Sequence, residues 1–244
     1  MMKIVTLNTW GTNGPYEKRF ELIGFELKQL NPDIVCLQEV FDARLEKLIK
    51  EKCGFKNSHV SYPAGLSILS NYSITETREL KYRALSQLET NDRRAIFSSV
   101  QANDDTIWVG NTHLAWKAED DAVRFAQAKE LLDEANPLEK FSILTGDFNC
   151  TSDTAPILQL KKSGFVDVFE TLHPNEKGYT WDNDRNSYLK TPSVVFPNRR
   201  IDLILATKGL LRKLKPKVCE LAFTKRDADG TLPSDHFGVF VEFE

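Results

Sequence analysis

Four sites in this sequence place polar residues directly after short apolar runs. Asn8 follows KIVTL, Glu39 follows DIVCLQ and His113 follows TIWVGNT. Asp147 and Asn149 follow FSILTG. Short runs rich in β-branched residues are typical of buried strands. We therefore expect each of these side chains just past the carboxyl end of a strand.

Further polar residues stand at the start of apolar runs. Asp202 opens IDLILA, and Asp235 and His236 precede FGVFVEF. If these last strands run antiparallel to the first four, all of these residues meet at one edge of the sheets. Carboxylates brought together repel one another and raise one another's pKa, and a divalent cation removes that problem.

The types of these residues narrow the chemistry. Carboxylate and amide oxygens suit a hard ion such as Mg²⁺ or Mn²⁺. Mg²⁺ usually takes one or two protein carboxylates and keeps its waters for a phosphate substrate. His113 and His236 are suited to donate hydrogen bonds to a phosphoryl oxygen or a leaving group. The pattern indicates metal-assisted hydrolysis of a phosphate ester.

The elements that must position these residues are short. Apolar runs predict strands at Lys3–Leu7, Ile34–Leu37, Leu66–Leu69, Ala95–Val100, Thr106–Asn111, Phe141–Leu144, Ile201–Leu205 and Phe237–Phe243. Spacings of three and four predict helices at Glu17–Leu30, after a cap at Asp42, at Glu119–Ala135 and at Asp153–Lys162. Gly178–Arg200 has no clean period and is expected to be a long functional loop.

Strands alternate with helices in places and pair directly in others. The polar connection Gln101–Asp105 is typical of a hairpin. This mixture predicts mixed sheets covered by helices. Because no linker-like break interrupts the chain, we expect a single domain over residues 1–244.

Composition narrows the class of protein. Of the 244 residues, 41% are hydrophobic and 27% are charged, and the formal net charge is −3. These values exclude a disordered or membrane-spanning chain and argue against a surface coated with basic charge for non-specific DNA binding. None of the four cysteines forms a C-x-x-C pair, so no structural zinc site is expected. The amino terminus lacks a signal-peptide pattern, and we expect a cytoplasmic, monomeric protein without stable membrane insertion.

Six motifs together resemble a known family. LNTW, LQEV, NTHL, GDFN, RRIDLIL and PSDHFGV occur in the order of the endonuclease/exonuclease/phosphatase superfamily, the deoxyribonuclease-I-like group. The resemblance runs from Asn8 to His236. It implies an α/β (α+β) fold, a four-layer α/β/β/α sandwich with two mixed β-sheets packed face to face and helices outside.

The two halves of the chain resemble different branches of this superfamily. Apurinic endonucleases and tyrosyl-DNA phosphodiesterase 2 carry an acid at the position of Trp10, so LNTWG is closer to the neutral sphingomyelinases. GYTWDNDRNSYL and the motifs after it are similar to tyrosyl-DNA phosphodiesterase 2. The number of metal ions, the substrate and the choice between endo and exo cleavage therefore stay open.

The resemblance also implies roles for the polar residues. Glu39 is expected to be the main metal ligand, with Asn8 beside it and Asp235 near the metal. Asp147 would orient or activate the attacking water, and Asn149 would help to hold the water and the phosphate.

The remaining roles concern the two histidines. His113 and His236 would stabilise charge on the pentacovalent centre, and Asp202 would fix the tautomer of His236. The catalytic residues expected from the resemblance are thus His113, Asp147, Asn149, Asp202 and His236.

Substrate contacts have a functional and a structural interpretation. Trp116, Trp181 and Arg200 are candidates for binding the substrate. Alternatively, the aromatic side chains simply fold the loop down, and Arg199-Arg200 form a solvated entry to a strand. The run LRKLKPK is either a patch that binds nucleic acid or anionic lipid or a solvated face.

Nucleic acid is the favoured substrate, with DNA end processing or endonuclease activity. Two alternatives remain within the same chemistry: a sphingomyelinase-like phospholipase and a phosphatase for a small phosphorylated metabolite. Val194-Val195-Phe196 is the short apolar segment that could dock on a bilayer. A scaffold that lost its chemistry is the alternative of another class, and it would be expected to have lost the polar residues.

Overall fold

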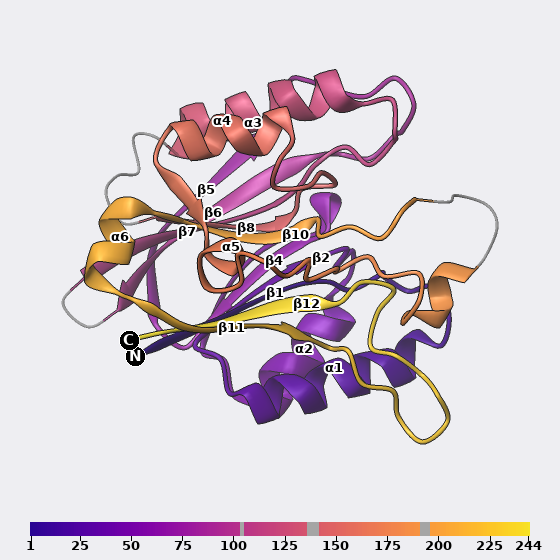
Figure 1. The fold of residues 1–244 in the computed structure, drawn as a ribbon. Helices are drawn as coiled ribbons and strands as arrows, with labels where there is room; N and C mark the ends of the chain where they lie inside the picture. Colours follow the sequence, from indigo (N-terminus) through magenta and orange to yellow (C-terminus); the bar gives the residue numbers. More distant parts are fainter. Residues whose placement is uncertain (103–104, 136–141, 191–195) are drawn as a thin grey trace.

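The computed structural model describes residues 1–102, 105–135, 142–190 and 196–244. Two six-stranded mixed sheets pack face to face, with α1 and α2 on one outer face and α3 and α4 on the other (Figure 1). The predicted four-layer α/β/β/α sandwich is confirmed.

The first sheet carries the strands that precede Asn8 and Glu39. Its order is β11-β12-β1-β2-β4-β3. The bounds are β1 Met2–Asn8, β2 Ile34–Gln38, β3 Asn57–Ser61, β4 Leu66–Ser70, β11 Pro216–Ala222 and β12 Gly238–Phe243. β1 runs parallel to β2 and antiparallel to β12. The start of β12 therefore lies at the same edge of the sheet as the ends of β1 and β2.

The second sheet repeats this arrangement. Its order is β5-β6-β7-β8-β10-β9. The bounds are β5 Ser73–Lys81, β6 Arg94–Ala102, β7 Asp105–His113, β8 Ser142–Asp147, β9 Phe165–Asp167 and β10 Asp202–Thr207. β7 and β8 are parallel, and antiparallel pairing sets Asp202 of β10 opposite Asp147 of β8. Each sheet therefore contains the antiparallel strand that brings its later residues, Asp202 in one sheet and Asp235-His236 in the other, to the same edge as the first four sites.

Four helices cover the sheets at the positions that the sequence predicts. Their bounds are α1 Tyr16–Leu30, α2 Ala43–Cys53, α3 Asp121–Ala135 and α4 Ala155–Lys162. α1 ends at Asn31, whose φ of 48° is left-handed. Asp42 caps α2 by accepting a hydrogen bond from the backbone N–H of Arg44 at 2.9 Å. No helix in the described ranges is long and apolar enough to cross a bilayer.

Three apolar layers hold the sandwich together. Ile4, Ile68, Ile107 and Val241 belong to the core between the sheets and are almost fully buried. Separate clusters seal each pair of helices against its sheet. Burying each large aliphatic side chain stabilises the fold by about 1.5–3 kcal/mol. The packing of these layers holds the polar edges of the two sheets next to each other.

Several helices and strands of the structure were not predicted from the sequence. β5 is an edge strand with the polar sequence SITETRELK, and six of its nine residues are exposed. The basic run LRKLKPK is divided between the end of α6 (Lys208–Lys213) and the start of β11, and its Arg and Lys side chains are exposed. Further elements are α5 (Val168–Leu172) and 3-10 turns at Tyr62–Ala64 and Ser187–Lys190. Residue 141 of the predicted strand Phe141–Leu144 and residues 194–195 lie outside the described residues.

Candidate active site

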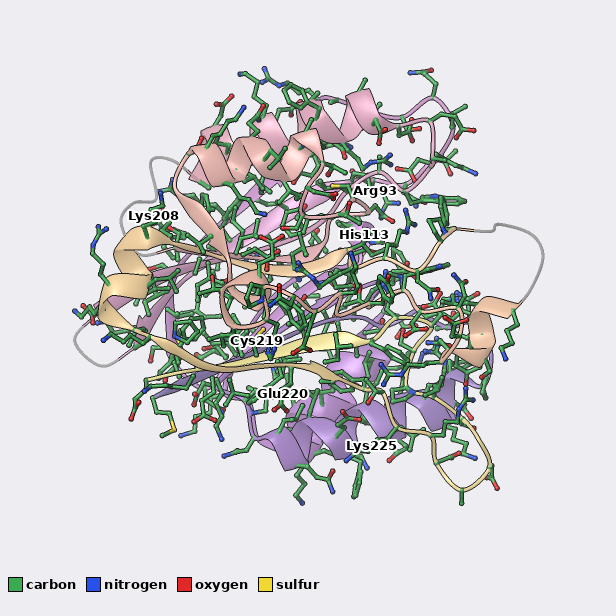
Figure 2. All side chains as sticks on the ribbon, viewed as in Figure 1. Arg93, His113, Lys208, Cys219, Glu220 and Lys225 are labelled. Carbon is green, nitrogen blue, oxygen red and sulfur yellow. The ribbon has the colours of Figure 1, made fainter. Side chains whose placement is uncertain are left out.

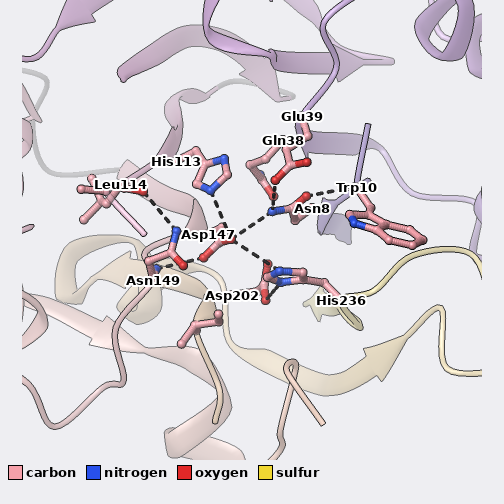
Figure 3. A network of polar contacts seen from close by, with 12 residues as sticks. Asn8, Trp10, Gln38, Glu39, His113, Leu114, Asp147, Asn149, Asp202 and His236 are labelled. Atoms are coloured by element: carbon pink, nitrogen blue, oxygen red, sulfur yellow. Dashed lines mark hydrogen bonds and ion pairs between the residues drawn. The ribbon is translucent and has the colours of Figure 1, made fainter. Parts of the chain in front are cut away.

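The polar residues singled out from the sequence lie together where strands of both sheets end (Figure 3). Seven of them line one cavity of about 390 Å³: Asn8, Glu39, His113, Asp147, Asn149, Asp235 and His236. Asp202 is fully buried behind His236. Figure 2 shows His113 and Arg93 close together at one end of the sandwich, away from Lys208 of α6.

Asn8 connects two carboxylates in this cavity. Its Nδ2 donates to Oε1 of Glu39 at 3.1 Å and to Oδ2 of Asp147 at 3.0 Å. Its Oδ1 accepts from the backbone N–H of Trp10 at 3.0 Å. Both Glu39 and Trp10 have left-handed backbones, with φ of 62° and 60°. Such conformations are costly for non-glycine residues and are common at functional sites.

Two carboxyl groups of the cavity, Glu39 and Asp235, are difficult to ionise without a counter-ion. Burial raises the pKa of Glu39, and the neighbouring Asp147 raises it further. Burial raises the pKa of Asp235 to about 7, and Glu39 adds to the rise. A hard divalent cation would favour the ionised carboxylates. The donor set of Glu39, Asp235 and Asn8 therefore fits such an ion.

Asp147, Asp202 and His236 form a second group close enough to hold a metal. Their ligand atoms lie within 4.8 Å of one another. However, Nδ1 of His236 is 2.9 Å from Oδ2 of Asp202, a buried hydrogen bond that occupies this imidazole nitrogen. We interpret this group as a carboxylate–imidazole pair facing Asp147.

His236 is held in its cationic form. Burial alone would lower its pKa, but Asp202 and Asp147 together raise the pKa of His236 to about 10. Its Nε2 lies 3.8 Å from Oδ2 of Asp147. The indole ring of Trp181 meets the imidazole edge-on, with ring centroids 5.1 Å apart. His236 can therefore present an N–H to an anion in the cavity.

His113 has the opposite protonation state. Burial, with help from the Arg93 guanidinium, lowers the pKa of His113 to about 3. Its Nε2 lies 3.4 Å from Oδ2 of Asp147. At neutral pH the site therefore combines one neutral and one charged imidazole.

Asp147 stays ionised between these rings. Burial opposes its ionisation, but His113 and His236 more than compensate, so the pKa of Asp147 lies below its usual range. Its Oδ1 accepts from the backbone N–H of Asn149 at 2.9 Å. Asn149 in turn donates from Nδ2 to the carbonyl of Leu114 at 3.1 Å. These bonds orient the Asp147 carboxylate towards the cavity.

Aromatic side chains form much of the cavity wall. Trp116 and Trp181, predicted to contact substrate, both line it. Arg93, Tyr188 and Arg199, for which the sequence left both a substrate contact and a structural role open, line it as well. Lining residues that the sequence did not connect with the substrate are Trp10, Asn13, Asn91, Leu189 and Phe196. Arg93 and Arg199 are each half of an Arg-Arg pair, and such a pair does not reveal which arginine faces inward.

Arg200, the predicted substrate contact, lies outside this cavity. Its Nη1 donates to Oδ2 of buried Asp167 at 2.7 Å. Arg199 lines the cavity instead. Successive side chains of an extended segment point in opposite directions, which explains why one arginine faces the site and its neighbour does not.

A buried arginine supports the loop that carries Trp10. Nη1 of Arg19 donates to the carbonyls of Thr9 at 2.6 Å and Pro233 at 3.0 Å. Its Nη2 donates to the carbonyl of Gly11 at 2.7 Å. Arg19 thereby connects the first and last motifs of the site. Its place on the buried face of α1 gave no signal of this role in the sequence.

Comparisons with known proteins agree with this geometry. The model of the Endonuclease/Exonuclease/phosphatase family matches residues 5–236. Tyrosyl-DNA phosphodiesterase 2 of Xenopus laevis is 24% identical over 254 residues, covering 98% of this chain and 66% of that protein. Sphingomyelinase C of Bacillus cereus is 26% identical over 240 residues, covering 82% of this chain and 70% of that protein. The chain thus spans just under two thirds of the frog relative.

Solved structures show the same fold. D. rerio TDP2 complexed with single strand DNA product has a TM-score of 0.85 at 22% identity, covering 100% of this chain and 98% of that chain. Beta toxin from Staphylococcus aureus has a TM-score of 0.80 at 22% identity, covering 100% of both chains. At these identities the likeness concerns the fold alone.

Proposed function

The chain belongs to the endonuclease/exonuclease/phosphatase family, and on that basis we propose that it is a Mg²⁺- or Mn²⁺-dependent phosphodiesterase acting on nucleic acid. The observation that carries this proposal is the buried cluster in which Asn8 joins Glu39 to Asp147 while Asp202 orients His236. Buried charges at this density are typical of catalytic sites.

Glu39, with Asn8 and Asp235, would hold the metal ion. When bound, the ion supplies charge neutralisation at the phosphoryl group and a more acidic water. Asn8 sets the separation between Glu39 and Asp147 through its two amide hydrogens. Asp235 contributes a carboxylate that burial otherwise keeps partly protonated near neutral pH.

Asp147 is suited to orient the attacking water and accept its proton. Its pKa lies below the usual range, so the carboxylate is ionised at neutral pH. Oδ1 is held by Asn149, and Oδ2 faces Asn8 and the two histidines. Water attacks phosphorus in line, the P–O bond to the leaving group breaks, and the proton from the water passes to Asp147.

The two histidines would stabilise the phosphoryl oxygens. His236, protonated at Nδ1 towards Asp202, can donate from Nε2 to the developing negative charge. His113 is neutral and can donate one hydrogen bond without adding charge. Preorganised donors of this kind are commonly worth about 10²–10³ in kcat.

Nucleic acid is the favoured substrate class. The frog tyrosyl-DNA phosphodiesterase 2 relatives align with 96–98% of the chain. Trp116, Trp181 and Tyr188 line the cavity, and such rings can stack on bases. Arg93 and Arg199 add positive charge to the wall.

A sphingomyelinase-like activity is the second candidate. Sphingomyelinase C of Bacillus cereus aligns with 82% of the chain. Phe41 is 57% exposed beside a cavity that Glu39 and His113 also line, and an exposed aromatic ring can enter a bilayer interface. A small phosphorylated metabolite remains a third substrate. The intact polar cluster argues against a scaffold that has lost its chemistry.

A comparison of three substrates tests the proposal. A 5′-phosphotyrosyl oligonucleotide, an abasic duplex and sphingomyelin vesicles are each incubated with Mg²⁺, with EDTA and with the Asp147→Asn variant. We expect cleavage of an oligonucleotide that disappears in EDTA and in the variant. Cleavage of sphingomyelin alone would replace the nucleic-acid assignment. No metal-dependent cleavage of any phosphoester in a wider panel would reject the catalytic proposal.

A further inference from the structure

Arg199 stands where two cavities meet. One is the active-site cavity, and the other, of about 580 Å³, is lined by residues that include Ser152, Tyr179 and Asn198. Arg199 lines both of them. A substrate that extends from the catalytic residues towards the second cavity would therefore pass its guanidinium group.

The guanidinium of Arg199 has no hydrogen-bond or ion-pair partner among the described residues. Two other arginines at or beside the cavity each bind a carboxylate, although Nε of Arg200 also has no hydrogen-bond partner in the described part of the chain. Arg93, also in the cavity wall, binds Glu89 through two hydrogen bonds of 2.9 and 2.8 Å. Arg200 binds Asp167. An arginine has five donors in a planar fork that matches phosphate and carboxylate oxygens, and in Arg199 these donors are unused.

The side chains around the guanidinium of Arg199 exclude part of its water, but no carboxylate of the described residues is hydrogen-bonded to it. The Arg199 guanidinium carbon lies 3.9 Å from the centroid of the Phe196 ring and 5.8 Å from that of Trp181. Burial lowers the pKa of Arg199, although Asp147 opposes this effect. A guanidinium that is held against aromatic rings and partly dehydrated binds an anion more strongly than one in open water.

The backbone around Arg199 is fixed in place. Trp181 and Arg199 form an antiparallel bridge, with both N–H to carbonyl bonds at 2.9 Å. The side chain of Asn183 donates to the carbonyl of Phe196 at 2.8 Å and to Oδ1 of Asn198 at 2.9 Å. This preorganisation reduces the entropy lost when a ligand binds.

We propose that Arg199 is the core of a second anion subsite, which binds a phosphate group of the substrate other than the one being hydrolysed. The inference rests on the proposed phosphodiesterase function and specifies its substrate as a molecule with at least two phosphates. The second cavity carries Lys177 and Arg200 but also Asp153, Glu170 and Glu176, so its lining mixes both signs of charge. The second phosphate is accordingly placed at the junction of the cavities.

Matched chromogenic substrates test this subsite. Thymidine 5′-(4-nitrophenyl phosphate) is compared with the same compound carrying a 3′-phosphate. In a second pair the 4-nitrophenyl phosphate is at the 3′ position, without and with a 5′-phosphate. We expect the wild-type protein to prefer the bisphosphorylated member of one pair by about ten- to a hundredfold in kcat/KM, mainly through a lower KM. This is the effect of one hydrogen bond between oppositely charged groups.

The variants Arg199→Gln and Arg199→Lys address the arginine itself. Arg199→Gln should bring the preference close to one, and Arg199→Lys should keep part of it because the charge remains. Arg212→Gln removes the same charge from exposed α6, at the far end of the sandwich, and should keep the full preference. A loss in Arg199→Gln that falls equally on both substrates would overturn the proposal, because Arg199 would then act on the scissile phosphate.

A binding measurement separates this inference from the proposed function. Thymidine 3′,5′-bisphosphate and thymidine 5′-monophosphate are titrated by calorimetry in EDTA, where no turnover is needed. Tighter binding of the bisphosphate that disappears in Arg199→Gln supports the subsite even if no substrate is hydrolysed. Equal affinities in the wild-type protein, or no binding of either, would overturn it. Propane-1,3-diol bisphosphate carries two phosphates but no nucleoside, and it shows which kind of ligand the subsite accepts. Binding as tight as that of thymidine 3′,5′-bisphosphate indicates a small bisphosphate, and weaker binding indicates a nucleotide.

Discussion

At the scale of single residues, Asn8 joins the two carboxylates that the chemistry requires. Its Nδ2 donates to both Glu39 and Asp147. Asn8→Asp replaces these donors with a further carboxylate in a buried site. We predict a fall in kcat of about 10²–10³ because the water-orienting carboxylate loses its alignment. Steady-state kinetics at saturating Mg²⁺ measure the effect, with circular dichroism to check the fold. A kcat within about threefold of wild type would contradict this role.

The pair of Asp202 and His236 predicts a pH dependence. The pKa of His236 is raised from 6.5 to about 10, so the imidazolium is present at low pH and is lost as the pH rises through the folded value. Its contribution to stability is complete below about 6.5 and disappears between about 6.5 and 10. Asp202→Asn removes a charge that raises this pKa. The alkaline limb of the kcat profile should therefore move to lower pH, and an unchanged limb would contradict the assignment.

The two adjacent arginines show what could and could not be predicted for single residues. The motifs located the polar residues expected to bind metal or act in catalysis, because each of these residues stands next to a strand end in the chain, but they did not locate Asn13, Asn91 or Arg93 of the cavity wall. The choice between Arg199 and Arg200 depends on which face of an extended segment is buried. Asp167 decides this, and it lies 33 residues away in the chain.

At the scale of elements, the close approach of β7 and β8 depends on Gly146. Its φ is 135°, and a Cβ at this position would lie 2.0 Å from the carbonyl oxygen of Thr112. Gly146→Ala should therefore destabilise the fold by more than about 3 kcal/mol, since both the backbone conformation and the space are unavailable. Urea unfolding measures the loss. Gly54→Ala, which has a left-handed φ but open space, is the control and should cost less.

Prediction of the elements succeeded where burial leaves an apolar pattern. β2 is buried at every position, and its run DIVCLQ was recognised as a strand. β5 alternates polar and partly buried residues at a sheet edge, and β11 begins at a proline after a basic run, so neither carries such a pattern. These strands form by pairing with a neighbouring strand, β5 with β6 and β11 with β12.

At the scale of the whole molecule, the two sheets act as one support for the site. Asn8 and Glu39 come from the first sheet, whereas His113, Asp147 and Asp202 come from the second. The predicted family and sandwich fold are confirmed. Because residues of both sheets form the site, its assembly depends on the packing between the sheets.

We propose that the chain acts as a single-domain monomer. All of the motif residues of the site come from one chain, so no second copy is needed to complete it. Size-exclusion chromatography with light scattering should give a mass near 27.8 kDa, independent of concentration. A stable dimer that loses activity on dilution would contradict this proposal.

The most direct test of the central claim is the Mg²⁺ dependence of bis(4-nitrophenyl) phosphate hydrolysis by the wild-type protein and by Glu39→Gln. Glu39 is half-buried and hydrogen-bonded to Asn8, whereas Glu220 on β11 is exposed, so Glu220→Gln is the matched control. We predict saturable activation by Mg²⁺ in the wild-type protein and in Glu220→Gln. In Glu39→Gln, at least about a hundredfold more Mg²⁺ should be needed, because the main metal ligand is lost. Hydrolysis that does not depend on Mg²⁺, or the same dependence in all three proteins, would contradict metal-assisted catalysis at this site.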